Sequence, residues 1–300
     1  MSQAATGIGA NPDHDQLVQT SIREISHIAT LPEVTLKIIS LVEDPESTAQ
    51  DLNNIISNDP ALGARILKVV NSAFYGLPGQ IGSINRAIVL LGLNAVKNIA
   101  VAASLAKLFR GGQISANFNA RDLWIHSISV ATATRLLSDK AGLGLPDEAF
   151  LAGLIHDLGI MVEVQVHRTK LIAVLDRMES DSSKPFRELE TEIIGTTHEE
   201  FGSALCQAWK FPKSFIYVTG YHHRPMELAE EHRPLTGLVH LADIIVANQK
   251  LGFCASVELT EMNPELMEQL NLTSEGIDEV IEALPEALEE AMGLLNDSGG

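Results

Sequence analysis

The sequence contains little cysteine, few aromatic residues and about half as many basic as acidic side chains. Cys206 and Cys254 are its only cysteines, so no disulfide framework exists and we expect a reducing, cytoplasmic location. The 21 Lys and Arg residues face 39 Asp and Glu residues, a net charge of −18. This balance argues against a broad nucleic-acid surface and against an anionic membrane as a partner, and it indicates a soluble acidic protein.

The sequence also lacks long apolar runs. Its longest ones, such as Ile99–Leu108, are interrupted by residues such as Ser104 and Lys107, whereas a membrane span needs roughly 20 apolar residues. The first residues, "MSQAATGIGANPDHDQ", are polar and do not follow the basic-then-apolar order of a signal peptide. We therefore expect no membrane-spanning segment.

No run alternates apolar and polar residues as a half-buried strand does. Apolar residues instead recur three and four positions apart, as in Leu36, Ile39 and Val42. Asp59 followed by Pro60 indicates a capped helix start. The sequence thus predicts an all-α protein with two helical sub-regions.

Turn-rich segments divide the chain into four parts. We expect a flexible tail at residues 1–14, an N-terminal helical half at 15–115 and a second helical half at 116–255, with "FRGGQISANFN" at the boundary. An acidic extension at 256–300 follows, and its amphipathic pattern from Ser274 predicts a helix with a kink at Pro285. That helix either packs on the parent domain or binds a partner.

Three segments of the first half carry a family resemblance: "LPEVTLKII", "DPALGARILKVVNSAFYG" and "INRAIVLLGLNAVKN". They resemble the HDOD family of bacterial signalling domains, and the resemblance extends from Leu31 to Asp243. It implies an all-helical HD-like bundle related to the HD-domain phosphohydrolases. Members usually serve as regulatory modules, and many are thought not to catalyse a reaction. Nothing in the first half suggests catalysis, and Asn71 and Ser72 are expected to bond nearby backbone.

The second half places carboxylates inside apolar runs. Asp157 lies in "AGLIHDLGI" and Asp243 in "LVHLADIIV", and neither run contains a Lys or Arg. Burying an unpaired carboxylate costs several kcal/mol of folding free energy, so such a group needs hydrogen-bond donors, a cation or a metal as a partner. Single histidines on apolar faces are more often core residues than ligands, so a metal-free network of hydrogen bonds stays open as an alternative.

The order of these residues resembles the metal sites of HD domains, and most fully those of the HD-GYP phosphodiesterases. By that resemblance His126, His156, Asp157 and Asp243 form a basic metal set. The remaining three, His198, His222 and His223, complete a second metal position, with Asp157 bridging. The resemblance thus implies one or two transition-metal ions, and imidazole and carboxylate ligands favour Fe, Mn, Zn or Ni.

Further residues are weaker candidates. Asp122, one turn before His126, is either another ligand or a carboxylate at a helix N-terminus. His240 either braces the site or packs in the core. The other four histidines are expected on the surface or in loops: His14, His27, His167 and His232.

Features that hydrolysis requires are missing. HD-GYP enzymes continue the HD motif as His-Asp-x-Gly-Lys, but Ile160 stands at the lysine position and neither "VHRTKLIAV" nor "FRELETEII" resembles the GYP segment. No Gly-rich phosphate loop is present, and Arg224 and Lys210 offer only local charge. Ser127 and Ser129 form no nucleophilic triad, and Cys206 is expected in the core.

We therefore predict a regulatory signalling protein with a metal-binding pocket and little or no catalysis. The resemblance implies signalling proteins as partners, of two-component or cyclic-dinucleotide circuits, and no nucleic acid or membrane. The alternative is an active metal-dependent phosphohydrolase that acts on a nucleotide or cyclic dinucleotide.

Overall fold

The computed structural model describes residues 12–28, 33–42, 44, 46–72, 75–77, 79–105, 112–115, 118–181 and 183–296. Over these residues the regular structure is helical except for one two-stranded sheet. The predicted all-α class is therefore confirmed. Most of the predicted tail at residues 1–14 lies outside the described residues, and the first described helix already begins at Pro12.

Six helices precede the predicted boundary. They are α1 (Pro12–Ile28), α2 (Glu33–Val42), α3 (Ala49–Ser57), α4 (Pro60–Val70), α5 (Ile84–Leu91) and α6 (Leu93–Leu105). The Asp59 side chain accepts a hydrogen bond from the backbone N–H of Leu62, which confirms the predicted cap of α4. The Asn71 amide donates to the Ile81 carbonyl and its oxygen accepts from the Ile81 N–H, so Asn71 ties the turn after α4 together.

The helices after the boundary form the larger group. They are α7 (Ala120–Ala141), α8 (Pro146–Ile155), α9 (Leu158–Val166), α10 (Arg168–Ser180), α11 (Phe186–Ile193), α12 (His198–Ala208), α13 (Lys213–Tyr221) and α14 (Arg233–Asn248), with 3₁₀ turns at Pro225–Glu227 and Glu230–His232. The acidic extension adds α15 (Pro264–Gln269) and α16 (Ser274–Asn296).

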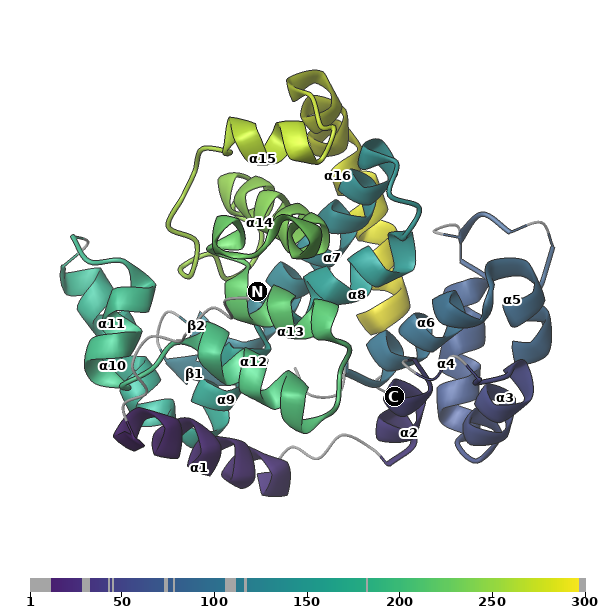
Figure 1. Ribbon diagram of the computed structural model, residues 1–300, viewed down its shortest axis with the longest axis horizontal. Helices are drawn as coiled ribbons and strands as arrows, with labels where there is room; N and C mark the ends of the chain where they lie inside the picture. The colour runs from purple at the N-terminus through teal and green to yellow at the C-terminus, as the bar shows by residue number, and fades with distance from the viewer. Residues whose placement is uncertain are drawn as a thin grey trace, which may run out of the picture.

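One continuous hydrophobic core joins the two groups. Helix α6 is buried from Val96 to Leu105 and lies between α2, α4 and α5 on one side and α8 on the other. Helix α7 holds the centre of the larger group, where it contacts α8, α14 and α16. Figure 1 shows α3, α4 and α5 together at one end of the molecule and α10 and α11 at the other.

Helix α1 is an exception to the expected grouping of residues 15–115. It packs against α9 and α12 of the second half, away from α3–α5 (Figure 1). The Ser21 hydroxyl lies 2.7 Å from Nε2 of His167, and Nε2 of His14 lies 2.9 Å from a Glu200 carboxylate oxygen. The first helix of the chain therefore packs with the second helical half, although it precedes the first half in sequence.

The expectation that the chain has no strands is wrong at the boundary segment. Strands β1 (Gln113–Ser115) and β2 (Phe118–Asn119) pair antiparallel there. Phe118 is buried against Phe253 at a ring-centroid distance of 4.5 Å, and Arg168 donates to the carbonyls of residues 113 and 114. Strands this short are too brief for an alternating pattern to be visible in the sequence.

One stretch of the described chain is long and apolar enough to cross a membrane by length and composition, contrary to expectation. It runs from Pro146 to Val166 through α8 and α9, and 78% of its most apolar 18-residue segment is buried inside the protein. A helix in the core of a protein can be equally long and apolar, and the polar pair His156 and Asp157 interrupts the Pro146–Val166 stretch. The burial favours the core interpretation.

Helix α16 packs on the parent domain, as one of the two alternatives predicted. Its residues Ile277, Val280 and Leu284 are buried, and the helix lies along α7 (Figure 1). The Lys140 amine of α7 pairs with the Glu279 carboxylate. Pro285 lies inside this helix.

The start of α9 approaches α12 closely at Gly159. A Cβ atom built on Gly159 would lie 1.7 Å from the carbonyl oxygen of His198, a distance that no side chain tolerates. This contact fixes Asp157, two residues earlier, beside His198.

We expect Gly159→Ala to lower the free energy of unfolding by about 3 kcal/mol or more, because α9 must move away from α12. The matched control is Gly276→Ala in α16, whose added Cβ would lie 3.4 Å from the Thr273 hydroxyl and clash with nothing. Alanine is the better helix former, so the control should be neutral or stabilising by up to about 1 kcal/mol. Urea unfolding followed by circular dichroism measures both, and equal effects would contradict the close-approach explanation.

Candidate metal centre

The pair His156 and Asp157 occupies the turn between α8 and α9. Both flanking helices are apolar around most of their circumference and buried. A turn between two buried helices places its side chains inside the core, so this pair lies at the centre of the protein. This position explains how two titratable residues come to lie in an apolar run.

Four other elements bring the remaining predicted ligands to the same place. His126 comes from the middle of α7, His198 is the first residue of α12, His222 and His223 follow α13, and Asp243 comes from the middle of α14. All seven predicted residues belong to groups whose ligand atoms lie within 4.8 Å of one another. The groups are His126, His156 and Asp157; Asp157, His198, His222 and His223; and His156, His222 and Asp243.

Asp157 is the hub of this cluster. Its Oδ2 lies 3.4 Å from Nε2 of His156 and 3.8 Å from Nε2 of His126. Its Oδ1 lies 3.4 Å from Nε2 of His222 and 3.6 Å from Nε2 of His198. Each carboxylate oxygen therefore faces a different pair of imidazoles, the arrangement expected of a bridging carboxylate.

Asp243 and His223 complete the cluster. Oδ1 of Asp243 lies 3.1 Å from Nε2 of His126, and its Oδ2 lies 3.9 Å from Nδ1 of His223. Nε2 of His223 lies 3.0 Å from Nε2 of His198. His223 is the most exposed member, with 8% of its side chain accessible, whereas Asp243 is 2% exposed and the others 0%.

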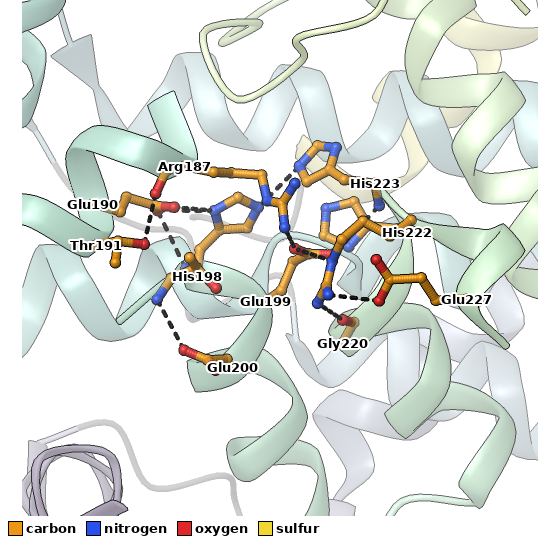
Figure 2. Close-up of polar contacts among 12 residues, drawn as sticks. Arg187, Glu190, Thr191, His198, Glu199, Glu200, Gly220, His222, His223 and Glu227 are labelled. Carbon is orange, nitrogen blue, oxygen red and sulfur yellow. Dashed lines mark hydrogen bonds and ion pairs between the residues drawn. The ribbon is translucent and has the colours of Figure 1, made fainter. Parts of the chain in front are cut away.

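Hydrogen bonds at Nδ1 orient three of the imidazoles. Nδ1 of His156 donates to the Gly153 carbonyl at 2.7 Å, and Nδ1 of His222 donates to the Val218 carbonyl at 3.2 Å. Nδ1 of His198 lies 2.8 Å from a Glu190 carboxylate oxygen (Figure 2). Because Nδ1 is occupied, each ring turns Nε2 toward Asp157, the usual arrangement around a metal-ligating histidine.

Several inward-facing atoms of the cluster have no hydrogen-bonding partner among the described residues. They are Nε2 of His126, His156 and His222, Oδ1 of Asp157 and Oδ1 of Asp243. These atoms face one another at ion-pair distances, the shortest being 3.1 Å between His126 and Asp243, but without the alignment of a hydrogen bond. Leaving buried polar atoms unsatisfied costs about 1–3 kcal/mol each. A cation at the centre would satisfy all of them together, so the donor set fits a metal ion.

The imidazoles also set the charge state of the carboxylates. Burial alone would raise the pKa of Asp157, but His156 and the other imidazoles around it outweigh burial and hold that pKa well below its usual value. Burial likewise acts to raise the pKa of Asp243, and His126 lowers it overall. Burial would lower the pKa of His126, yet Asp243 raises it to about 10. Both carboxylates are therefore held ionised.

Two buried glutamates beside the cluster were missed by the sequence reasoning. Glu190 on α11 and Glu163 on α9 are 0% exposed, and burial raises the pKa of each well above its usual value. Glu190 lies on the same helix face as Phe186 and Leu189. That spacing was the available signal, because it puts the Glu190 carboxylate on an apolar helix face within "FRELETEII".

A group of charged residues lies beside His223. The Glu199 carboxylate is fully buried and lies 2.7 Å from the Arg187 guanidinium and 3.3 Å from that of Arg224. It also accepts a hydrogen bond from the backbone N–H of His223. Figure 2 shows Arg187 near the His198 and His223 rings. Sequence reasoning named only Arg224, and nothing in the pattern indicated Glu199.

The loop after α14 covers the other side of the cluster. The Phe253 N–H donates to the Asp122 carbonyl, Sγ of Cys254 lies 3.9 Å from Nδ1 of His126, and the Ser256 hydroxyl lies 3.5 Å from Oδ2 of Asp157. A Cβ on Gly252, where φ is +77°, would lie 2.4 Å from the backbone of α7. Glycine at this position lets the loop seat directly over His126.

Asp122 lies outside the cluster. It is in none of the groups of potential ligands among the described residues, and it lines a neighbouring cavity with Gly252 and Cys254. Asp122 lies in the first turn of α7, which agrees with the second alternative, a carboxylate at a helix N-terminus. His240 does brace the site, since its Nδ1 donates to the His222 carbonyl at 2.7 Å.

The other histidines differ in their surroundings. His232 is exposed as predicted. His14 and His167 are partly buried and tie α1 to the second half, and His167 lies in the bend between α9 and α10, a loop position as predicted. The side chain of His27 lies outside the described residues.

The residues set aside as catalytic candidates are structural. The hydroxyls of Ser127 and Ser129 donate to backbone carbonyls one turn earlier in α7. Cys206 is buried, and burial raises the pKa of its thiol to about 12. Ile160 is also fully buried.

Comparison with known proteins shows which family this sequence matches. The sequence profile of the HDOD domain matches residues 28–225. An uncharacterized protein of Treponema pallidum (strain Nichols) is 27% identical over 223 residues, which are 74% of this chain and 42% of that protein. The chain thus spans less than half the length of that relative.

Solved structures share the fold. An HDOD domain protein of unknown function from Geobacter sulfurreducens superposes with a TM-score of 0.76 at 22% identity, over 93% of this chain and 98% of that one. A protein of Shewanella amazonensis SB2B described as a candidate phosphohydrolase superposes with a TM-score of 0.72 at 22% identity, over 94% of this chain and 98% of that one. A candidate signal transduction protein of Marinobacter aquaeolei VT8 superposes with a TM-score of 0.75 at 20% identity, over 98% of this chain and 68% of that one.

We expect Arg187→Gln to lower the free energy of unfolding by about 2 kcal/mol, because Arg224, at 3.3 Å, is then the one cationic partner of the buried Glu199 carboxylate that the structure describes. Arg177→Gln is the matched control, since its pair with Asp181 is exposed and should be worth less than about 0.5 kcal/mol. Denaturant unfolding of both variants measures the difference. Equal stabilities would show that Glu199 does not depend on Arg187.

Proposed function

Because the chain belongs to the HDOD domain family, we propose that it is a regulatory signalling domain built around a buried transition-metal centre, with little or no hydrolase activity. The observation that carries the metal centre is the set of inward-facing Nε2 and Oδ1 atoms without partners among the described residues. Imidazole and carboxylate ligands favour Fe, Mn, Zn or Ni over Ca or Mg.

The seven residues divide between two ion positions. His126, His156 and Asp157 would hold one ion, with Asp243 beside it. Asp157, His198, His222 and His223 would hold the second. Asp157 is shared, since its two oxygens face the two sets of imidazoles. When bound, such ions supply Lewis acidity and orient their ligands.

Three features support a regulatory role over hydrolysis. Ile160 is a buried apolar residue at the position where the HD-GYP motif has lysine. Both nearby guanidiniums are already paired with Glu199. Six of the seven proposed ligands are at most 2% exposed, so a nucleotide phosphate would have to displace covering side chains to reach them. Phosphoryl transfer needs free positive charge aimed at the substrate.

The alternative is an active metal-dependent phosphohydrolase on a nucleotide or cyclic dinucleotide. One observation favours it: Arg187 and Arg224, both partly exposed, lie beside His223, the most accessible of the proposed ligands. Movement of Glu199 would free both for an anion. In the regulatory proposal, output passes instead through contacts with other signalling proteins in the cytoplasm.

We expect Asp157→Asn to weaken transition-metal binding by about a hundredfold or more, because it removes the charge of the shared ligand while keeping its shape. Asp122→Asn is the matched control on α7 and should bind metal like the unmodified protein. Competition titration with a chromophoric chelator gives the affinities. Unchanged binding by Asp157→Asn would contradict the proposed ligand set.

Glu190→Gln provides a graded test of the same centre. Residues that orient a metal-ligating histidine typically change metal affinity about 10- to 100-fold when replaced. We expect a loss in that range for Glu190→Gln and none for the exposed Glu188→Gln on the same helix. The same chelator titration measures both variants, and a loss in Glu188→Gln of equal size would indicate a general effect of charge.

A further inference from the structure

A second pocket lies at the opposite ends of helices that carry the metal centre. Its volume is about 230 Å³, and it lies among the end of α7, the loop before α8, and the starts of α13 and α14. Leu143, Leu145, Leu235 and Leu238 give it a mainly apolar lining. Ser138 of this pocket lies twelve residues after His126 on α7, which corresponds to about 18 Å along the helix. The pocket is therefore separate from the metal centre.

Two local features of this pocket work against stability of the free protein. Leu145 stands at the N-cap of α8, where it makes no capping hydrogen bond and its side chain is 50% exposed. Ser, Thr, Asp or Asn at an N-cap would stabilise the helix by about 0.5–2 kcal/mol.

The second feature is a buried hydroxyl without a partner. The other Ser and Thr hydroxyls in the buried part of α7 donate to the carbonyl four residues earlier, namely those of Ser127, Ser129, Thr132 and Thr134. The Ser138 hydroxyl lines the pocket, is fully buried and has no hydrogen-bonding partner among the described residues. Its oxygen is shielded from solvent, so a ligand would reach it only after the lining side chains move.

The rim of the pocket carries one charge of each sign. Lys213 and Glu231 both line it and both are exposed, and neither forms an ion pair within the described part of the chain. The rings of Tyr217 and His232 stack beside them at a centroid distance of 4.8 Å. A ligand here meets an ammonium, a carboxylate, aromatic faces and an apolar interior.

We propose that this pocket binds a free α-amino acid with a large aromatic side chain. The ligand carboxylate would face Lys213, its ammonium would face Glu231, and its ring would enter the leucine-lined interior. A dry cavity of about 150 Å³ is enough to bind benzene, so 230 Å³ holds one aromatic ring with a short substituent. A dinucleotide is far too large. The proposal does not depend on the metal centre.

The test is a titration of the full chain with L-phenylalanine, followed by NMR of ¹³C-labelled leucine methyl groups. We expect saturable shifts confined to Leu143, Leu145, Leu235 and Leu238. Phenylacetate lacks the ammonium and phenethylamine lacks the carboxylate, so each should bind about three- to tenfold more weakly, the range of one charged contact.

Two charge variants assign the contacts. Lys213→Gln should bind L-phenylalanine only as tightly as phenethylamine, and Glu231→Gln only as tightly as phenylacetate. Both residues are exposed, so folding should be preserved. The matched controls are Lys210→Gln and Glu230→Gln, exposed neighbours that do not line the pocket and should leave the affinity unchanged.

Three results would overturn the proposal. One is the absence of saturable shifts up to about 10 mM ligand, which corresponds to binding weaker than the millimolar range. Another is equal affinity for L-phenylalanine and its two singly charged analogues, which would indicate an unselective apolar cavity. The third is an equal loss in the control variants, which would assign the effect to surface charge.

Discussion

The structure depends on keeping two ionised carboxylates at the centre of an apolar core. Asp157 and Asp243 are almost completely buried, and the imidazoles around them hold both pKa values low. Charges in such surroundings are costly unless they are paired and hydrogen-bonded. Much of the second half can be understood as a means of meeting this cost: imidazoles face the carboxylates, and a metal ion would complete the set.

Helix ends provide most of this arrangement. The His156 and Asp157 turn, the first residue of α12 and the two residues after α13 meet at one point, because the start of α9 lies in contact with α12 at Gly159. The rings are then turned by carbonyls at Gly153 and Val218 and by Glu190. Backbone acceptors and a buried carboxylate hold the ring orientations in advance, so a metal would meet preformed ligands.

The helical class follows from the spacing of the apolar residues, and the resemblance to HD-domain sites named the seven residues that the structure brings together. Both rest on local features of the sequence. The sequence did not predict what depends on tertiary contact. The position of α1 against α9 and α12 follows from contacts such as Ser21 with His167, between residues far apart in sequence. Glu199 became part of the site only because Arg187 and Arg224, from two other segments, converge on it. The strands at the boundary are too short to show an alternating pattern, and Phe118 is buried there by contact with Phe253, which is distant in sequence.

The most direct measurement of the central claim is elemental analysis of the protein purified without a histidine tag, combined with a phosphodiesterase assay on the same metal-loaded sample. A buried metal centre in a regulatory domain predicts about one to two transition-metal ions per chain and no turnover above that of the Asp157→Asn variant. Metal with turnover that disappears in Asp157→Asn would contradict the regulatory role and identify a phosphohydrolase. Absence of bound metal after loading with Fe, Mn, Zn and Ni would contradict the metal centre itself.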